Sequence, residues 1–113
     1  MRISDYRFGR LVVDRRTYTS DLIICGDRVL GDWWRKEGHR IDLQDLGRVS
    51  LEAGAHLIIG TGYNDCVAVS PSLVEYCRKN RIILEAIPTP QAVTRFNSLS
   101  GEPSLVGAFH LTC

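Results

Sequence analysis

The segment Leu57-Ile58-Ile59, followed directly by Gly60-Thr61-Gly62, constrains the fold of this chain more than any other segment. Apolar residues at three consecutive positions, without polar alternation, are typical of a strand that is buried on both faces. The glycines then predict a loop of bare backbone at the end of the strand. We therefore expect a buried central strand that ends in a loop of the kind that often binds ligands.

Helix and strand signals alternate from residue 42 onward. Ser70-Pro71 and Thr89-Pro90 each predict a helix start, because a hydroxyl caps free amides and proline suits the first helical position. The expected order is a short helix from Asp42, a strand over 56–59, a short apolar piece over 66–69, a helix from 70, a strand over 82–87, a helix from 89 that Gly101 ends, and a strand over 105–111. This order predicts an α/β layer structure in which residues 56–60, 82–87 and 105–111 are neighbouring, largely parallel strands of one sheet.

The first third of the chain has a different pattern. Residues 8–13, residues 21–25 and Val29-Leu30 are apolar or β-branched runs separated by turn-rich polar residues, which indicates an antiparallel β region. A chain of 113 residues with 44% hydrophobic and 24% charged residues can build one core. Because no linker or repeat divides the chain, we expect one α/β domain over residues 1–113.

Charge and hydropathy disfavour several classes of protein. Fourteen basic against thirteen acidic residues leave a formal charge of +1, far from the positive field that nucleic-acid binding usually needs. No apolar run approaches the roughly 20 residues that span a bilayer, and the polar N-terminus lacks the apolar core of a secretory signal. These features predict a soluble cytoplasmic protein that inserts in no membrane and binds no nucleic acid.

Neither a metal nor a cofactor is predicted. The cysteines stand singly along the chain at Cys25, Cys66, Cys77 and Cys113, and no histidine lies at zinc-ligand spacing. The glycine loop fails the dinucleotide fingerprint because Asp65 occupies the third glycine position, and no Gly-Lys-Ser or Gly-Lys-Thr marks a P-loop. Cys113 is expected to be accessible but has no activating partner nearby in sequence, so its role stays open.

The first candidate for binding is the loop after the central strand together with the start of the third helix. Its residues are Gly60, Thr61, Gly62, Asn64 and Thr89. Loops after successive parallel strands emerge on one edge of a sheet, where backbone amides and a helix N-terminus can receive a small anion. Turn geometry alone explains the glycines equally well.

The second candidate is an interaction surface in the connection after the N-terminal strands. Its residues, Trp33, Trp34, Arg35 and His39, combine aromatic faces with cations, which suits an anchor for a protein partner. The alternative is one indole in the core, one partly exposed indole and a solvated loop.

No catalytic residues are predicted. Serine-hydrolase chemistry needs a nucleophile, a histidine and an acid held together, and no Gly-x-Ser-x-Gly elbow occurs. His110 is expected to be a partly buried histidine with satisfied hydrogen bonds, and His56 is expected near the exposed end of the central strand. Asn97 interrupts the apolar face of the third helix and needs hydrogen-bond partners if it is buried.

Several short segments, in their order and spacing, resemble the Mth-938-like domain, a small α/β family of largely unknown function. The matching segments are Phe8-Gly9, Tyr18, Asp21-Leu22-Ile23-Ile24, Trp34-Arg35, Gly38-His39, Ile59-Gly60-Thr61-Gly62, Thr89-Pro90-Gln91-Ala92, Phe96-Asn97-Ser98-Leu99 and His110-Leu111-Thr112-Cys113. Together they cover essentially the full chain. The resemblance implies a central mixed sheet with helices on one side and an additional small β layer.

The resemblance also bears on function. Relatives in animals include an assembly factor of mitochondrial respiratory complex I and an adipogenesis-associated cytosolic protein, neither of them an established enzyme. This implies a non-catalytic interaction or assembly-helper role in the cytoplasm, with another protein as partner. The alternative is a protein that binds a small anionic ligand, or a minor enzyme, with a pocket at Gly60–Asn64. We do not carry over the organellar role, because the targeting extension of the assembly factor is missing.

Overall fold

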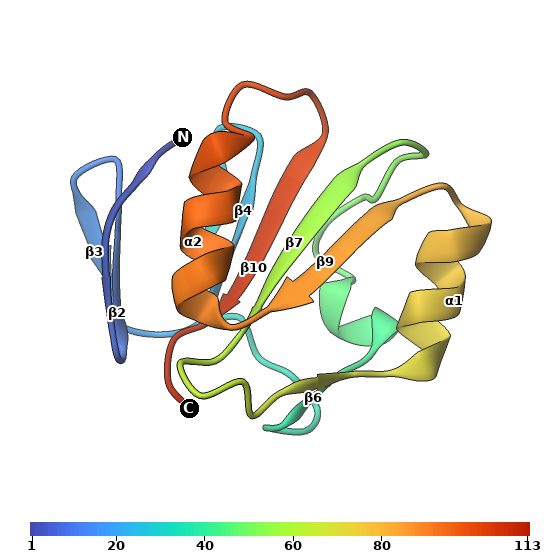
Figure 1. The fold of residues 1–113 in the computed structure, drawn as a ribbon, viewed down its shortest axis with the longest axis horizontal. Coiled ribbons are helices and arrows are strands. Elements are labelled where there is room, and N and C mark those ends of the chain that lie inside the picture. The colour runs from blue at the N-terminus through green and yellow to red at the C-terminus, as the bar shows by residue number, and fades with distance from the viewer.

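Three sheets and two α-helices make up the structure, a computed structural model that describes all residues from 1 to 113 (Figure 1). The strands are β1 (Ile3–Arg7), β2 (Arg10–Val13), β3 (Arg16–Tyr18), β4 (Leu22–Cys25), β5 (Arg28–Leu30), β6 (Arg40–Ile41), β7 (His56–Thr61), β8 (Ala68–Val69), β9 (Ile83–Ile87) and β10 (Leu105–His110). The helices are α1 (Pro71–Lys79), α2 (Thr89–Ser98) and the short 3-10 helix η1 (Leu43–Leu46). No helix is long and apolar enough to cross a membrane.

A mixed five-stranded sheet forms the centre, in the order β5-β4-β10-β7-β9. Strands β10, β7 and β9 are parallel neighbours, whereas β4 is antiparallel to both of its neighbours, β10 and β5. The prediction that residues 56–60, 82–87 and 105–111 share one sheet is therefore confirmed. All six residues of β7 are buried, because β10 and β9 flank the strand and both faces are covered.

The two α-helices cover opposite faces of this sheet. The core of one face includes Leu73 and Cys77 of α1 with Leu57 and Ile59 of β7. The core of the other face includes Ala92 and Phe96 of α2 with Ile58 and Phe109. Successive residues of β7 point to opposite faces, so the two helices cannot share a side.

The implied placement of the helices on one side of the sheet is therefore wrong. Strand β9 lies at one end of the parallel group, so the chain moves outward from β7 to β9 through α1 and then back to β10 through α2. Crossovers between parallel strands are almost always right-handed, and two such crossovers in opposite directions place their helices on opposite faces.

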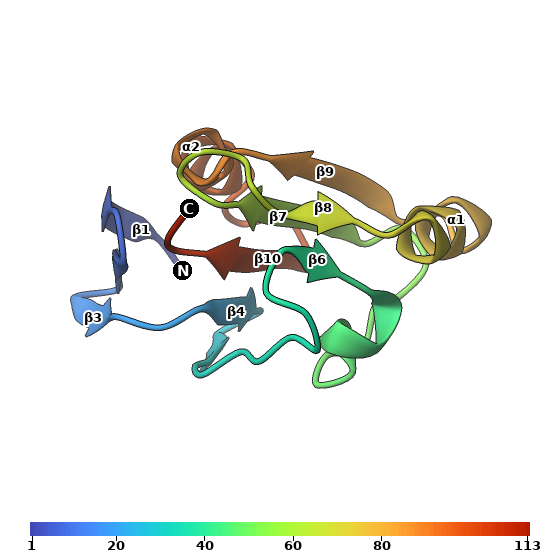
Figure 2. The ribbon, with the colours of Figure 1, turned by 90° about the horizontal axis from the view of Figure 1, so that it is seen from below.

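A three-stranded antiparallel sheet, β1-β2-β3, forms the additional N-terminal layer, as predicted (Figure 2). It packs against α2 and the central sheet through Ile3, Leu11 and Val13. Asn97 of α2 joins the layers, since its side chain accepts a hydrogen bond from the Ile3 N–H at 2.9 Å and donates one to the Ile3 carbonyl at 2.7 Å. The expected requirement of Asn97 for partners is thus met by the backbone of β1.

Several predicted boundaries differ from the structure. The helix expected from Asp42 is only the 3-10 helix η1, and the last helix ends at Ser98 instead of reaching Gly101. Ser70 caps α1 as predicted, because its hydroxyl accepts a hydrogen bond from the Leu73 N–H. Thr89 does not cap α2. Its buried hydroxyl is bonded to other segments, and it is the first helical residue.

Candidate functional site

A pocket of about 450 Å³ lies where β10 ends and the chain enters β4. It is covered by the connection that follows β5, which carries the two tryptophans. The side chains that line the pocket include Asp21, Trp34, Arg35, His110 and Thr112. Because β4 runs antiparallel to β10, the residue before β4 and the last residue of β10 meet at this end of the sheet.

Asp21 is the centre of the polar cluster in this pocket. One carboxylate oxygen accepts hydrogen bonds from Arg35 Nη1 and from His110 Nδ1, both at 2.6 Å. The other accepts the Leu111 N–H at 2.8 Å. Burial alone would raise the pKa of Asp21, but these bonds from His110, Arg35 and Leu111 outweigh it and lower the pKa. Asp21 is therefore an ionised, accepting group at neutral pH.

The ionised carboxylate fixes the tautomer of His110. A carboxylate only accepts hydrogen bonds, so at 2.6 Å Nδ1 of His110 carries the proton that Asp21 binds, and Arg35 Nη2, a donor 3.1 Å from the same nitrogen, makes no hydrogen bond to it. In the neutral ring Nε2 is then the acceptor, and it lies 3.4 Å from the hydroxyl of Thr112. The pocket thus offers an oriented imidazole nitrogen that can accept a hydrogen bond.

The adjacent tryptophans have opposite environments. Trp33 is only 3% exposed, and its indole N–H donates to the Asp45 carbonyl at 2.7 Å. The Arg35 guanidinium lies 5.0 Å from the centre of the Trp33 ring, a cation–π distance, and the Arg35 side chain is 6% exposed. Trp34, by contrast, is 84% exposed. The alternative of one core indole and one exposed indole therefore describes this segment.

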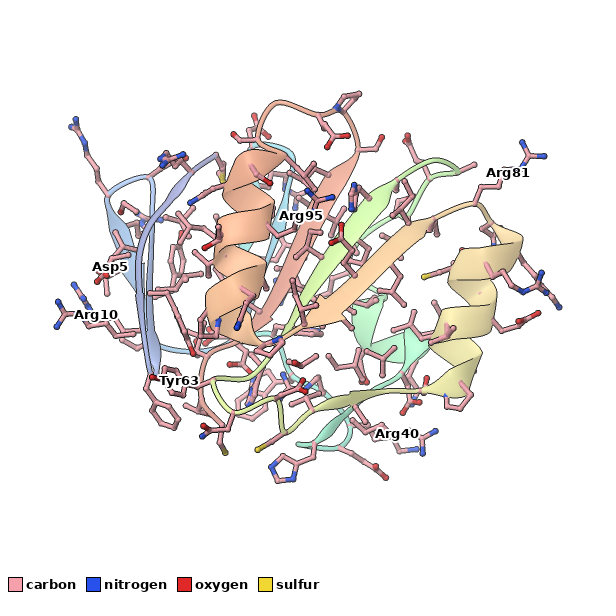
Figure 3. The ribbon with its side chains drawn as sticks, viewed as in Figure 1. Asp5, Arg10, Arg40, Tyr63, Arg81 and Arg95 are labelled. Atoms are coloured by element: carbon pink, nitrogen blue, oxygen red, sulfur yellow. The ribbon has the colours of Figure 1, made fainter.

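Two more exposed aromatic side chains, Phe8 and Tyr63, contact each other edge to face near the pocket, with ring centres 6.1 Å apart. Figure 3 shows Tyr63 beside the tip of the hairpin formed by β1 and β2. The Tyr63 N–H donates to the Thr112 carbonyl at 2.7 Å, and the hairpin residue Gly9 donates to the Leu111 carbonyl at 2.8 Å. We call Phe8, Trp34 and Tyr63 the aromatic surface, since all three lie around Thr112.

The glycine loop is tightly packed. Gly62 has a φ of +106°, and a Cβ atom there would lie 2.3 Å from the Cys113 carbonyl oxygen. The Gly62 N–H donates to the Thr89 hydroxyl at 2.9 Å, and the Thr89 N–H donates to the Gly62 carbonyl at 3.0 Å. These amides are engaged with each other, so close packing explains the glycines better than an open anion site does.

Each of the two predicted groups of binding residues therefore contains both buried or immobilised residues and exposed ones. Gly60, Thr61, Gly62 and Thr89 are buried and line no pocket, while Asn64 is exposed beside them. In the second candidate group, Trp34 and His39 are exposed, whereas Trp33 is buried and Arg35 is held by Asp21. The anion site and the interaction surface both stay predictions.

Sequence reasoning missed Asp21, His110 and Thr112 as pocket residues. Asp21 and His110 are far apart in sequence, and only the pairing of β4 with β10 brings them together. The Nδ1 atom of His110 has a hydrogen-bond partner in Asp21, as expected, while Nε2 has only the Thr112 hydroxyl at 3.4 Å. The expectation for His56 was wrong: His56 is buried and bonded at 2.5 Å to Glu85 of β9, which lies two residues beyond Ile83, the residue that pairs with His56.

A mixed sheet with one helix on each face and an antiparallel layer against α2 has the fold of a small α/β domain of the Mth938-like kind. Residues 3–111 match the family described as "protein of unknown function (DUF498/DUF598)", and the chain belongs to that family.

Solved structures support the fold. A conserved hypothetical protein from Pyrococcus horikoshii matches with a TM-score of 0.84 at 23% identity over 100% of both chains. The protein MT938 matches with a TM-score of 0.73 at 22% identity, over 99% of this chain and 98% of its own. A Mth938-like domain from Bordetella pertussis matches with a TM-score of 0.68 at 22% identity, over 97% of this chain and 85% of its own.

Proposed function

We propose that this chain is a non-catalytic interaction domain that binds another protein through the aromatic surface, in the manner of an assembly helper. One observation carries this proposal: three of the five exposed large hydrophobic side chains gather around Thr112, next to the pocket. Grouped exposed aromatic residues are characteristic of protein–protein contacts, in which tryptophan and tyrosine contribute most of the binding energy.

The backbone on both sides of Trp34 is held in place, which suits a role in binding. Its neighbours on both sides are immobilised, Trp33 by the core and Arg35 by the ion pair with Asp21. The backbone that carries the exposed indole is therefore held before any partner arrives, which lowers the entropy cost of binding. The pocket beside the indole can accept a side chain of the partner, and His110 Nε2 offers that side chain an acceptor.

The alternative function, binding of a small anionic ligand, has weaker support. At the glycine loop the Gly62 and Thr89 amides already have partners. In the pocket the positive charge of Arg35 is matched by Asp21, and a second carboxylate, Asp32, lies in the pocket wall. Neither place offers an anion a free positive charge, so a protein partner is the better proposal.

Affinity capture with matched variants tests the proposal. Tagged wild-type protein, Trp34→Ala and Val74→Ala are incubated with lysate of the source organism, and bound proteins are quantified by mass spectrometry. Val74 is the control because it is an exposed apolar residue on α1, outside the aromatic surface. We expect a protein that wild type and Val74→Ala retain and that Trp34→Ala retains at least about tenfold less. Equal retention by all three proteins contradicts the proposal.

A further inference from the structure

Two exposed cysteines from distant parts of the sequence lie next to each other. The Cys66 N–H donates a hydrogen bond to the Cys113 carbonyl at 3.1 Å. Both residues are exposed, whereas Cys77 is buried and Cys25 is half-buried. Figures 1 and 2 both place the C-terminal segment beside the loop that follows β7. The chain therefore brings together the backbones of its two exposed cysteines.

The backbone separation of these cysteines suits a disulfide. The N–Cα bond of Cys66, the 3.1 Å hydrogen bond and the Cα–C=O unit of Cys113 together keep the two Cα atoms within roughly 7 Å of each other. Disulfides join residues whose Cα atoms are about 4.4–6.8 Å apart. The side chain of Cys66 makes one hydrogen bond, a weak one from Sγ to the Asn64 carbonyl at 3.8 Å, which a rotation of the thiol toward Cys113 would break at little cost.

Both partners are held in place. Gly62 lets the Cys113 backbone approach, because any side chain there would collide with the Cys113 carbonyl. On the Cys66 side, Asp65 has a positive φ of 59°, and its carboxylate accepts a hydrogen bond from the Thr61 hydroxyl. The loop geometry that leaves no room for an anion therefore fixes the two cysteines relative to each other.

We propose that Cys66 and Cys113 form a dithiol site that a small disulfide such as glutathione disulfide oxidises. The thiolate of one cysteine attacks glutathione disulfide, so a mixed disulfide forms and one glutathione thiolate leaves. The second cysteine, as thiolate, attacks the protein sulfur of this mixed disulfide, and the second glutathione thiolate leaves. Two protein thiols are oxidised to one disulfide, and one glutathione disulfide is reduced to two glutathione molecules.

The disulfide fixes the C-terminal segment to the loop after β7. Thr112, which precedes Cys113, lines the pocket and bonds through its carbonyl to Tyr63 of the aromatic surface. Oxidation thus holds the centre of the aromatic surface in a single position. This site is independent of the proposed partner, since it requires only the two thiols.

Thiol mapping of the native protein tests the site. The reduced protein is incubated with glutathione disulfide, and the remaining thiols are alkylated. Peptides are then analysed by mass spectrometry after cleavage at aromatic residues, which separates Cys66 from Cys77 because Tyr76 lies between them. We expect a Cys66–Cys113 disulfide with no bound glutathione, and Cys77 alkylated only after denaturation.

Two single variants are the matched controls. Cys113→Ser should keep glutathione on Cys66, and Cys66→Ser should keep it on Cys113, because the second attack is missing in each. Glutathione that stays bound to either cysteine of the wild-type protein, or a disulfide that involves Cys25, overturns the proposal. Failure of both thiols to react with glutathione disulfide also overturns it.

Discussion

Asp21 joins three segments of the chain through one carboxylate, so its replacement tests the polar cluster at the scale of a single residue. Asp21→Asn removes the negative charge and leaves the Arg35 guanidinium, 6% exposed, without a counter-ion. Breaking such a pair from one side costs about 3 kcal/mol of unfolding free energy. Urea unfolding at pH 7 measures this loss. The control is Asp5→Asn, which breaks an exposed pair with Arg10 and should cost less than about 1 kcal/mol.

The effect of Asp21→Asn on the unfolding free energy should depend on pH. The pKa of Asp21 is lowered in the folded protein, so its stabilising effect is complete above the unfolded-state pKa of about 3.9 and is lost as pH falls through the folded-state value. The difference in unfolding free energy between wild type and Asp21→Asn should therefore be large at pH 7 and shrink below about pH 4. A difference of unchanged size at the lowest pH at which wild type still folds contradicts this assignment.

Substitution of Gly62 tests whether close packing accounts for the glycines of the loop after β7. Gly62→Ala places a methyl group against the Cys113 carbonyl in addition to straining a φ of +106°. Gly101→Ala is the matched control, because its φ is +98° but nothing lies within 4 Å of the added methyl. The control should lose about 1–2 kcal/mol from backbone strain alone, and Gly62→Ala about 1–3 kcal/mol more. Thermal unfolding compares them, and equal losses would show that the C-terminal segment does not crowd Gly62.

Among the helices and strands, the sequence predicted the elements that are fixed by contacts between residues close together in the chain. The start of α1 was predictable because Ser70 and its capped amide at Leu73 belong to the same turn. Strand β1 was not predictable, because its sequence is mostly polar. Pairing with β2 and the hydrogen bonds between Asn97 and Ile3 stabilise it instead. Thr89-Pro90 is a similar helix-start signal, yet the hydroxyl of Thr89 is hydrogen-bonded to the glycine loop and to β10 and does not cap α2.

Strand β7 is the element whose burial the sequence predicted most directly. Ile58 is fully buried beneath α2, so Ile58→Asp should destabilise the fold by several kcal/mol, on the order of 4, because the charge has no partner there. Ile83→Asp is the control in the neighbouring strand β9, where the isoleucine side chain is more than half exposed. Circular dichroism should show a much larger fall in melting temperature for Ile58→Asp. Similar falls for both variants would mean that β7 is not the core strand.

For the molecule as a whole, the sequence predicted the fold more completely than the site. The prediction that the three parallel strands share one sheet followed from alternating helix and strand signals, and the family resemblance followed from motifs spread over the chain. The pocket depends instead on contacts between distant segments, such as Asp21 with His110 and Tyr63 with Thr112. No spacing in the sequence encodes those contacts, because strand pairing alone sets which ends of the sheet meet.

The proposed contact between the aromatic surface and a protein partner involves the folded molecule as a whole. Site-specific photo-crosslinking in cells of the source organism tests it most directly, with benzoylphenylalanine placed at position 34, 8 or 63 and, as control, at position 74. These positions carry Trp34, Phe8, Tyr63 and the exposed Val74 of α1. We expect one common partner protein to be cross-linked from positions 34, 8 and 63 and not from position 74. The same products from position 74, or no product from position 34, would contradict the claim.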